Sequence, residues 1–264
     1  MTSMPISRFT PSVLPHAALE ATFVQRSGLA RRIVENIGET VGKGSSTNYL
    51  LIGPRGIGKT HTVSLLFHRL RAAFPERQLL IAWLREEEWG VASFLDLQLR
   101  ILNSLNPGAD WLERTGLFDT DPSTASRLAT ERIKDLLGAR SLLIIVENLD
   151  DLFEGLGDIG QKEFRAFLQE SQRISLLATA QGLFNGVSLQ TSPFYGFFRV
   201  EHLKPLTLKQ AISLLAKLAG QQGDNSLSRY LETPAGRARV RAIHRLAGGN
   251  HRVYVIFSQF LSKA

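Results

Sequence analysis

The chain has 264 residues, of which 44% are hydrophobic and 21% are charged, and these values are ordinary for a globular protein. That length accommodates one large α/β domain with a small appendage. Cysteine is absent, which excludes disulfides, thiolate metal sites and a cysteine nucleophile. No apolar run approaches the roughly 20 residues of a membrane span, and the start, MTSMPISRFT, lacks the pattern of a secretory signal. We therefore expect a soluble, cytoplasmic protein.

The net charge of +7 is concentrated toward the end of the chain. From residue 201 onward ten Lys or Arg accompany three Asp or Glu, whereas residues 1–200 carry 21 of each sign. A basic appendage on a neutral core favours a polyanion partner, with nucleic acid first. The alternative is a solvated helical face with some arginines turned toward a bound nucleotide. The candidate contacts to double-stranded DNA are Arg237, Arg239, Arg241 and Arg245.

Hydrophobic patterning predicts strands that alternate with helices, followed by helices alone. An extended lead-in is expected over residues 1–20 and an irregular insertion over residues 106–122. The expected strands are Tyr49–Ile52, Leu79–Leu84, Ser141–Val146, Ile174–Ala180 and Phe198–Leu203. The expected helices are Ala21–Glu39, Thr60–Phe74, Val91–Leu105, Ser123–Leu137 (capped by Ser123), Gln161–Glu170, Thr207–Gly220, Ala235–Ala247 and His251–Ser262.

Strands that alternate with helices require right-handed crossovers and hence a parallel sheet. The sequence therefore predicts an α/β fold with a five-stranded parallel sheet. We expect the α/β domain to occupy residues 1–203. A small all-helical lid is expected over residues 204–264.

The segment Gly53–Thr60 reads GPRGIGKT and matches G-x-x-x-x-G-K-[ST], with an expected strand before it and a helix after it. Such a loop directs backbone N–H groups and a helix N-terminus at phosphate oxygens. The expected fold is therefore of the P-loop NTPase type, and residues 1–203 are the expected nucleotide-binding domain. Lys59 is expected to reach the β- and γ-phosphates, and the Thr60 hydroxyl to ligate Mg²⁺. No guanine-reading N-K-x-D sequence follows the third strand, which favours ATP. The predicted nucleotide-binding residues here are Gly53, Pro54, Arg55, Gly56, Ile57, Gly58, Lys59, Thr60 and His61.

The third expected strand ends in the acidic sequence VENLDD, residues 146–151. An apolar strand followed by acids is the Walker B pattern, so Glu147 is the expected magnesium-side carboxylate. An ordinary strand-end carboxylate in a helix cap is the alternative. Asn148 stands where a catalytic Glu is usual, and an amide orients water but cannot accept its proton. Either Glu147 or Asp150 then polarises the attacking water, or hydrolysis is slow, and we expect slow turnover.

Three further residues are candidates for contact with the γ-phosphate or the attacking water. Thr179 interrupts an apolar strand, although threonine is also simply a good strand former. Arg199 lies at the start of the fifth expected strand, beside the aromatic cluster of residues 194–198, where an oligomer interface could present it to a neighbour's ATP. Arg252, in GGNHR, could fold back over the γ-phosphate. A surface or salt-bridge arginine is the alternative for both.

Taken together, these motifs resemble the AAA+ superfamily, and within it the origin-recognition-like and STAND-like ATPases of bacteria and archaea. The resemblance is carried by FVQR (23–26), the P-loop, VENLDD, LLATA (176–180), HLKPLTLKQAISLL (202–215) and AGGNHR (247–252). It implies that Val24 and Arg26 lie beside the adenine and that Arg252 serves as sensor 2. The sequence VEN departs from the D-E or D-D pair common in the family.

The function expected first is an ATP-binding ATPase switch that forms a homo-oligomer with ATP and acts on or near DNA. The alternative is a STAND-like signalling or defence module with a protein partner and no affinity for DNA. A small-molecule kinase on the same fold explains neither the helical tail nor the GGNHR arginine.

Overall fold

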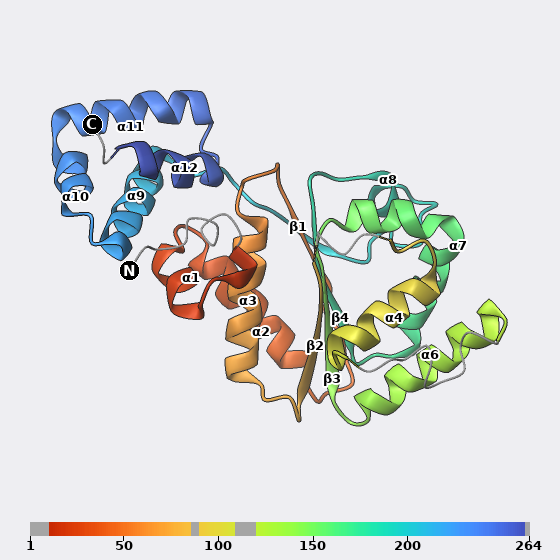
Figure 1. The fold of residues 1–264 in the computed structure, drawn as a ribbon. Helices are drawn as coiled ribbons and strands as arrows, with labels where there is room; N and C mark the ends of the chain where they lie inside the picture. Colours follow the sequence, from red (N-terminus) through yellow and green to blue (C-terminus); the bar gives the residue numbers. More distant parts are fainter. Residues whose placement is uncertain (1–10, 86–89, 109–119, 262–264) are drawn as a thin grey trace. The chain divides into compact units, whose positions relative to one another are not determined.

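The computed structural model describes residues 11–85, 90–108 and 120–261 (Figure 1). Internal contacts divide the chain into two compact units. The P-loop unit comprises Met1–Ile33, Gly53–Arg69 and His202–Ala264, and the sheet unit comprises Val34–Ile52 and Leu70–Glu201. This division groups the P-loop with the C-terminal helices. The expected domain boundary between residues 203 and 204 stays a prediction.

The sheet has five parallel strands in the order β2-β3-β4-β1-β5. They are β1 (Tyr49–Ile52), β2 (Leu79–Leu84), β3 (Ser141–Val146), β4 (Ile174–Ala180) and β5 (Arg199–His202). The first four have the bounds that the sequence predicts. Strand β5 is one residue shorter than expected at each end, so it begins at Arg199. The fold-class prediction is confirmed.

Helices α4 (Phe94–Leu105), α6 (Pro122–Leu137) and α7 (Leu149–Glu170) lie on one side of the sheet, and the short α8 (Asn185–Ser188) follows β4 (Figure 1). Every residue of β3 and β4 is buried. A strand covered on both faces needs apolar side chains at every position, which explains the unbroken runs. The helices contribute Ile101, Ile133 and Phe164 to the same core.

Three helix starts in the sheet unit differ from prediction. Helix α4 begins at Phe94 rather than Val91, with Ser93 as its N-cap. Helix α6 begins at Pro122, and its N-cap is Asp121, whose carboxylate accepts from the backbone N–H groups of Ser123 and Thr124. The predicted cap at Ser123 is therefore wrong, because the capping carboxylate lies two residues earlier and proline suits the first helical position. Helix α7 begins at Leu149, and Gly157, with φ of 59°, kinks it before the predicted segment.

In the P-loop unit, α1 (His16–Thr22) follows the 3₁₀ turn η2 (Pro11–Val13). The extended lead-in is therefore wrong for residues 16–20, and residues 1–10 lie outside the described part. Prolines suggested an open chain there, yet α1 is stabilised by tertiary contacts rather than by periodicity. Helix α2 (Ser27–Thr40) and the P-loop helix α3 (Lys59–Ala73) each begin in this unit and end in the sheet unit.

Four helices form the C-terminal part of the P-loop unit. They are α9 (Leu208–Gln222), α10 (Asn225–Glu232), α11 (Pro234–Ala247) and α12 (His251–Leu261), and the sequence missed α10. A capping box between Thr207 and Gln210 starts α9. Buried Leu214, Val240 and Tyr254 join α9, α11 and α12 in one apolar cluster. None of the helices in the described ranges has the length and hydropathy that crossing a bilayer requires.

Candidate nucleotide-binding site

The P-loop backbone depends on two glycines. Gly56 and Gly58 have φ of 80° and 99°, which side-chain-bearing residues rarely adopt. A Cβ on Gly56 would lie 2.6 Å from Asn250 Oδ1, and one on Gly58 would lie 3.0 Å from Arg26 Nη1. Conformation and space thus both require glycine at these positions.

Lys59 closes the loop on itself. Its Nζ donates to Gly53 O at 2.6 Å, and the residue is only 9% exposed. Lys59 and Thr60 also form the first turn of α3, a 15-residue helix whose N-terminus favours anions. A glycine cradle, an enclosed ammonium group and a helix N-terminus together fit a polyphosphate chain.

Arg26 supports the P-loop through hydrogen bonds to backbone carbonyls. Its Nη2 donates to Ile57 O and to Lys204 O, each at 2.9 Å, and its buried Nε has no hydrogen-bond partner among the described residues. Burial lowers the pKa of Arg26 to about 10, so it remains positive at neutral pH. The structure therefore places this guanidinium on the loop backbone. The adenine contact implied for Arg26 and for Val24, which packs with the C-terminal helices, stays a prediction.

The GGNHR turn docks on the tip of the P-loop. Arg252 N donates to Gly56 O at 2.9 Å, and Asn250 Nδ2 donates to Arg55 O at 2.9 Å. Asn250 Oδ1 also accepts from Arg252 N at 3.1 Å, which orders the start of α12. The Arg252 side chain is exposed. Sequence analysis singled out Arg252 but missed Asn250, the residue of the same motif that holds the loop.

His61 packs among rings rather than facing solvent. Its Nε2 lies 3.1 Å from Leu19 O, and because a carbonyl only accepts, that nitrogen carries the hydrogen. The His251 ring lies edge-on with its centroid 5.4 Å away, and the Phe23 ring lies 5.7 Å away. Burial lowers the pKa of both histidines, that of His251 to about 3. Both rings are therefore neutral at physiological pH.

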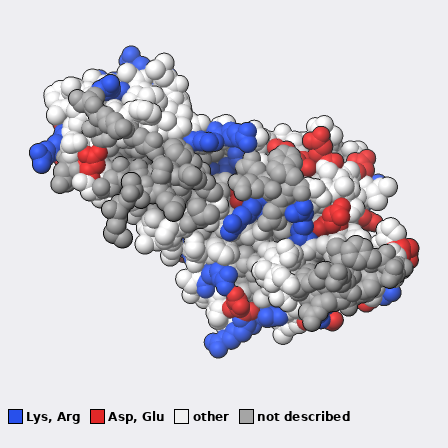
Figure 2. Space-filling view, in the orientation of Figure 1, with Lys and Arg blue, Asp and Glu red and all other residues white. Residues whose placement is uncertain are grey.

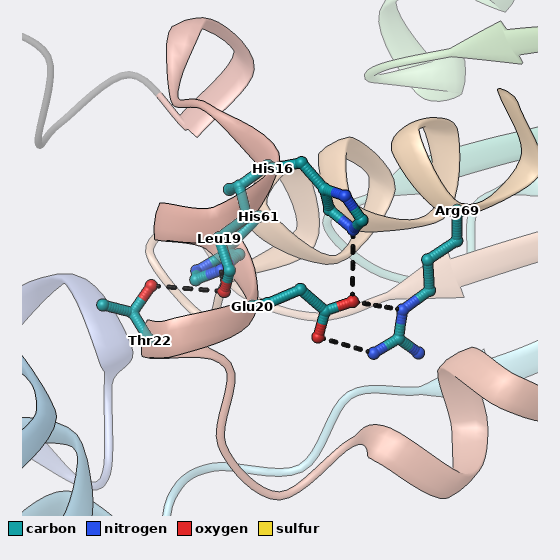
Figure 3. A network of polar contacts seen from close by, with 6 residues as sticks. All are labelled: His16, Leu19, Glu20, Thr22, His61 and Arg69. Carbon is teal, nitrogen blue, oxygen red and sulfur yellow. Dashed lines mark hydrogen bonds and ion pairs between the residues drawn. The ribbon is translucent and has the colours of Figure 1, made fainter. Parts of the chain in front are cut away.

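Helix α1 is tied to the P-loop helix by a charged network (Figure 3). Arg69 donates to both carboxylate oxygens of Glu20, from Nε at 2.7 Å and from Nη2 at 2.8 Å, and His16 Nε2 lies 3.3 Å from Glu20 Oε1. The hydrogen bond from Arg69 is the main cause that lowers the pKa of Glu20. Lys217 of α9 donates to Phe23 O at 2.7 Å. Helix α1 thus contacts both α3 and α9.

The acidic candidates lie in the sheet unit. Glu147 is 8% exposed, and its Oε1 accepts from Trp83 Nε1 at 3.0 Å. Asp150 Oδ1 is buried without a hydrogen-bond partner among the described residues. Within the described ranges no three His, Asp or Glu side chains gather as a metal site.

The backbone conformation at residue 148 favours asparagine. Its φ and ψ of 54° and 65° are left-handed, a region in which Asn is several-fold enriched. Its N–H donates at 3.1 Å to the hydroxyl of Thr179, which is 1% exposed. Thr179 therefore supports the turn after β3. Arg199 is exposed, with its guanidinium 6.0 Å from the centroid of the Tyr49 ring.

No protein-family model and no curated protein matches this sequence. Its structure is similar to the DNA-bound origin recognition complex (ORC) of Drosophila, with a TM-score of 0.67, 13% identity, and 100% of this chain and 62% of that chain covered. The structure is also similar to the Aeropyrum pernix ORC2 protein in ADPNP-ADP complexes, with a TM-score of 0.60 and 13% identity. That match covers 90% of this chain and 68% of the ORC2 chain. The ORC1 protein of the same organism, in complex with DNA, matches with a TM-score of 0.55 and 18% identity. That match covers 90% of this chain and 65% of the ORC1 chain.

These likenesses define the fold as that of a P-loop AAA+ ATPase. More narrowly, the fold is origin-recognition-like, as the motifs indicate. The chain spans about two thirds or less of the length of these solved chains.

Proposed function

We propose that this protein is an AAA+ ATPase that uses bound ATP as a conformational switch. The observation that carries the proposal is the P-loop itself, in which Lys59 and the glycines form a phosphate cradle. The GGNHR turn is hydrogen-bonded to that cradle. Binding of ATP in the cradle would therefore affect the position of the C-terminal helices. A DNA-binding ATPase and a signalling ATPase would both use such a coupling.

Mg²⁺ bound with ATP would be held by the Thr60 hydroxyl and by Glu147, and it would neutralise charge on the phosphates. Asp150, with its unpartnered oxygen, is the candidate to polarise the attacking water. Asn148 cannot take that proton, which supports slow turnover. Arg252 is the proposed sensor 2 arginine, and Thr179 acts through the turn that it supports.

We further propose that α11 contacts the phosphates of double-stranded DNA. Arg237, Arg241 and Arg245 recur every fourth residue and are exposed, so they follow one face of the helix in steps of about 6 Å. On the face in Figure 2, Lys and Arg lie at several points along the edge of the α10 and α11 region, with an acidic patch among them. Two of the similar solved structures are complexes with DNA.

The test of this surface compares two triple variants of equal charge. Arg237, Arg241 and Arg245 changed to Glu should abolish duplex binding and remove most of its salt dependence. Lys204, Lys209 and Arg229 changed to Glu alter the same unit by the same charge, and all three are exposed, so binding should largely persist. Equal losses in both variants would mean that only net charge matters.

A nucleotide-dependent homo-oligomer is the third part of the proposal. Tyr195 is 50% exposed beside Phe197, and exposed Arg199 starts the adjacent strand. An exposed aromatic next to an arginine is suited to an interface that presents a charge to a neighbour's nucleotide. Light scattering with and without ATP tests this, and Tyr195→Ala should reduce assembly while Leu183→Ala, exposed elsewhere, should not.

ATP turnover with and without duplex DNA separates the two classes of switch, with Lys59→Ala as the background. Stimulation by DNA supports the DNA-linked ATPase. ATP-dependent assembly with no DNA affinity would instead favour the signalling module with a protein partner.

A further inference from the structure

The carboxylate of Glu147 is held by a tryptophan on the neighbouring strand. Trp83 of β2 is paired with Ile145 of β3, and residues two apart on a strand share a face of the sheet. Trp83, Ile145 and Glu147 therefore lie on the same face, with the indole directed along the strand toward the carboxylate. The resulting bond from Nε1 to Oε1 is 3.0 Å, between residues that are 7% and 8% exposed.

The tryptophan is itself fixed in place. Its backbone N–H donates to Ser104 Oγ of α4 at 2.9 Å, which satisfies a group on the edge strand. The Arg85 guanidinium lies 4.9 Å from the ring centroid, within cation–π range. The Glu147 N–H also donates to Leu84 O at 3.1 Å, which extends the strand pairing by one residue. Donor and acceptor thus both sit on rigid backbone.

We propose that Trp83 is a positioning residue for the magnesium-side carboxylate. Its indole N–H holds Oε1 of Glu147, and with it the carboxylate, in a fixed orientation. A neutral donor suits this role, since it orders the carboxylate without competing for its charge as Lys or Arg would. This inference rests on the proposed binding of ATP and Mg²⁺.

The variant that isolates the hydrogen bond is Trp83→Phe, which keeps a ring and removes the N–H. Binding of a fluorescent ATP analogue is measured with and without Mg²⁺. Affinity without Mg²⁺ should stay within about twofold, while the gain conferred by Mg²⁺ should fall about tenfold, the size expected for one bond to a charged group. Phe164→Leu, a buried aromatic change in the same unit, is the matched control and should leave the gain unchanged.

A double-mutant cycle distinguishes positioning from a merely structural role. On a Glu147→Gln background, Trp83→Phe should cost no further Mg²⁺-dependent affinity. An equal loss on both backgrounds, or no loss in the single variant, overturns the inference while leaving the proposed function standing. A wild-type chain that binds no ATP with Mg²⁺ overturns the proposed function and this inference with it.

An NMR measurement without nucleotide tests the contact by itself. The chain has three tryptophans, so three indole N–H signals are expected, and Trp83→Phe identifies the one that disappears. Glu147→Gln should shift that signal and leave the others in place. An unmoved signal would show that the indole and the carboxylate do not interact in solution.

Discussion

The two units of this chain differ in what determines their functional residues. In the sheet unit, Glu147 and Thr179 are placed by strand register and local turns, so short sequence patterns locate them. In the P-loop unit, the loop is held by residues far away in the chain, Arg26 and Asn250. A motif thus identifies the phosphate cradle, but its shape depends on contacts that the motif does not contain.

The largest expected effect comes from breaking the cradle at Gly56. Gly56→Val forces a β-branched residue to a φ of 80° and against Asn250. ATP affinity should fall about 100-fold, because up to about 3 kcal/mol of strain is relieved only by moving the loop. Titration with a fluorescent ATP analogue measures this. Gly44→Val carries a similar backbone cost at φ of 65° with open space around it, and unchanged affinity is expected there.

Removing the long-range brace should be nearly as costly to the P-loop unit. Arg26→Met leaves the carbonyls of Ile57 and Lys204 without their shared donor. The free energy of unfolding should fall by about 3 kcal/mol, the range for losing charged hydrogen bonds in a buried site. Urea denaturation checks this value. A change below about 1 kcal/mol would mean that the loop holds its shape without Arg26.

Placing a carboxylate at residue 148, directly after β3, tests whether Asn148 accounts for slow hydrolysis. Asn148→Glu supplies a proton acceptor where the family commonly has one, so ATP turnover should rise about tenfold, a modest part of what a general base contributes. Asn148→Gly keeps the left-handed backbone without an acceptor and is expected to leave turnover low. A steady-state assay compares the two, and equal rates would refute the explanation for slow hydrolysis.

The smallest expected effect tests the network on α1 by its pH dependence. The bond from Arg69 holds the pKa of Glu20 below its ordinary value of 4.5 in the folded state. The stabilisation is therefore present above pH 4.5 and is lost as the pH falls through the lower, folded pKa. Glu20→Gln should cost about 0.5 kcal/mol at pH 7, since the pair is partly exposed. Thermal unfolding at pH 7 and pH 3 should show that difference shrinking.

Much of the fold could be predicted because buried parallel strands have recognisable apolar runs in the sequence. The runs YLLI, LLIAWL, SLLIIV and ISLLATA are predominantly apolar, and the structure gives their bounds as expected. Helices α1 and α10 could not be predicted from a pattern. They have 7 and 8 residues, too few for a clear helical period, and tertiary contacts stabilise them.

The candidate site could be predicted only in part, because the sequence shows the chemistry of a residue but not its long-range contacts. Sequence indicates which residues have suitable chemistry, and so it singled out Lys59, Glu147 and Arg252. It gave no sign of Trp83 or Asn250, because their importance arises from a contact with a residue 64 or 195 positions away.

Binding of ATP to the purified chain, measured by calorimetry in the presence of Mg²⁺, tests the central claim most directly. Lys59→Ala serves as the variant, and Lys209→Ala, an exposed lysine of α9, as its matched control. We expect saturable binding by the wild type and by Lys209→Ala, and its loss in Lys59→Ala. Wild-type heat indistinguishable from dilution, or equal binding by all three proteins, would contradict the assignment of this loop as a nucleotide site.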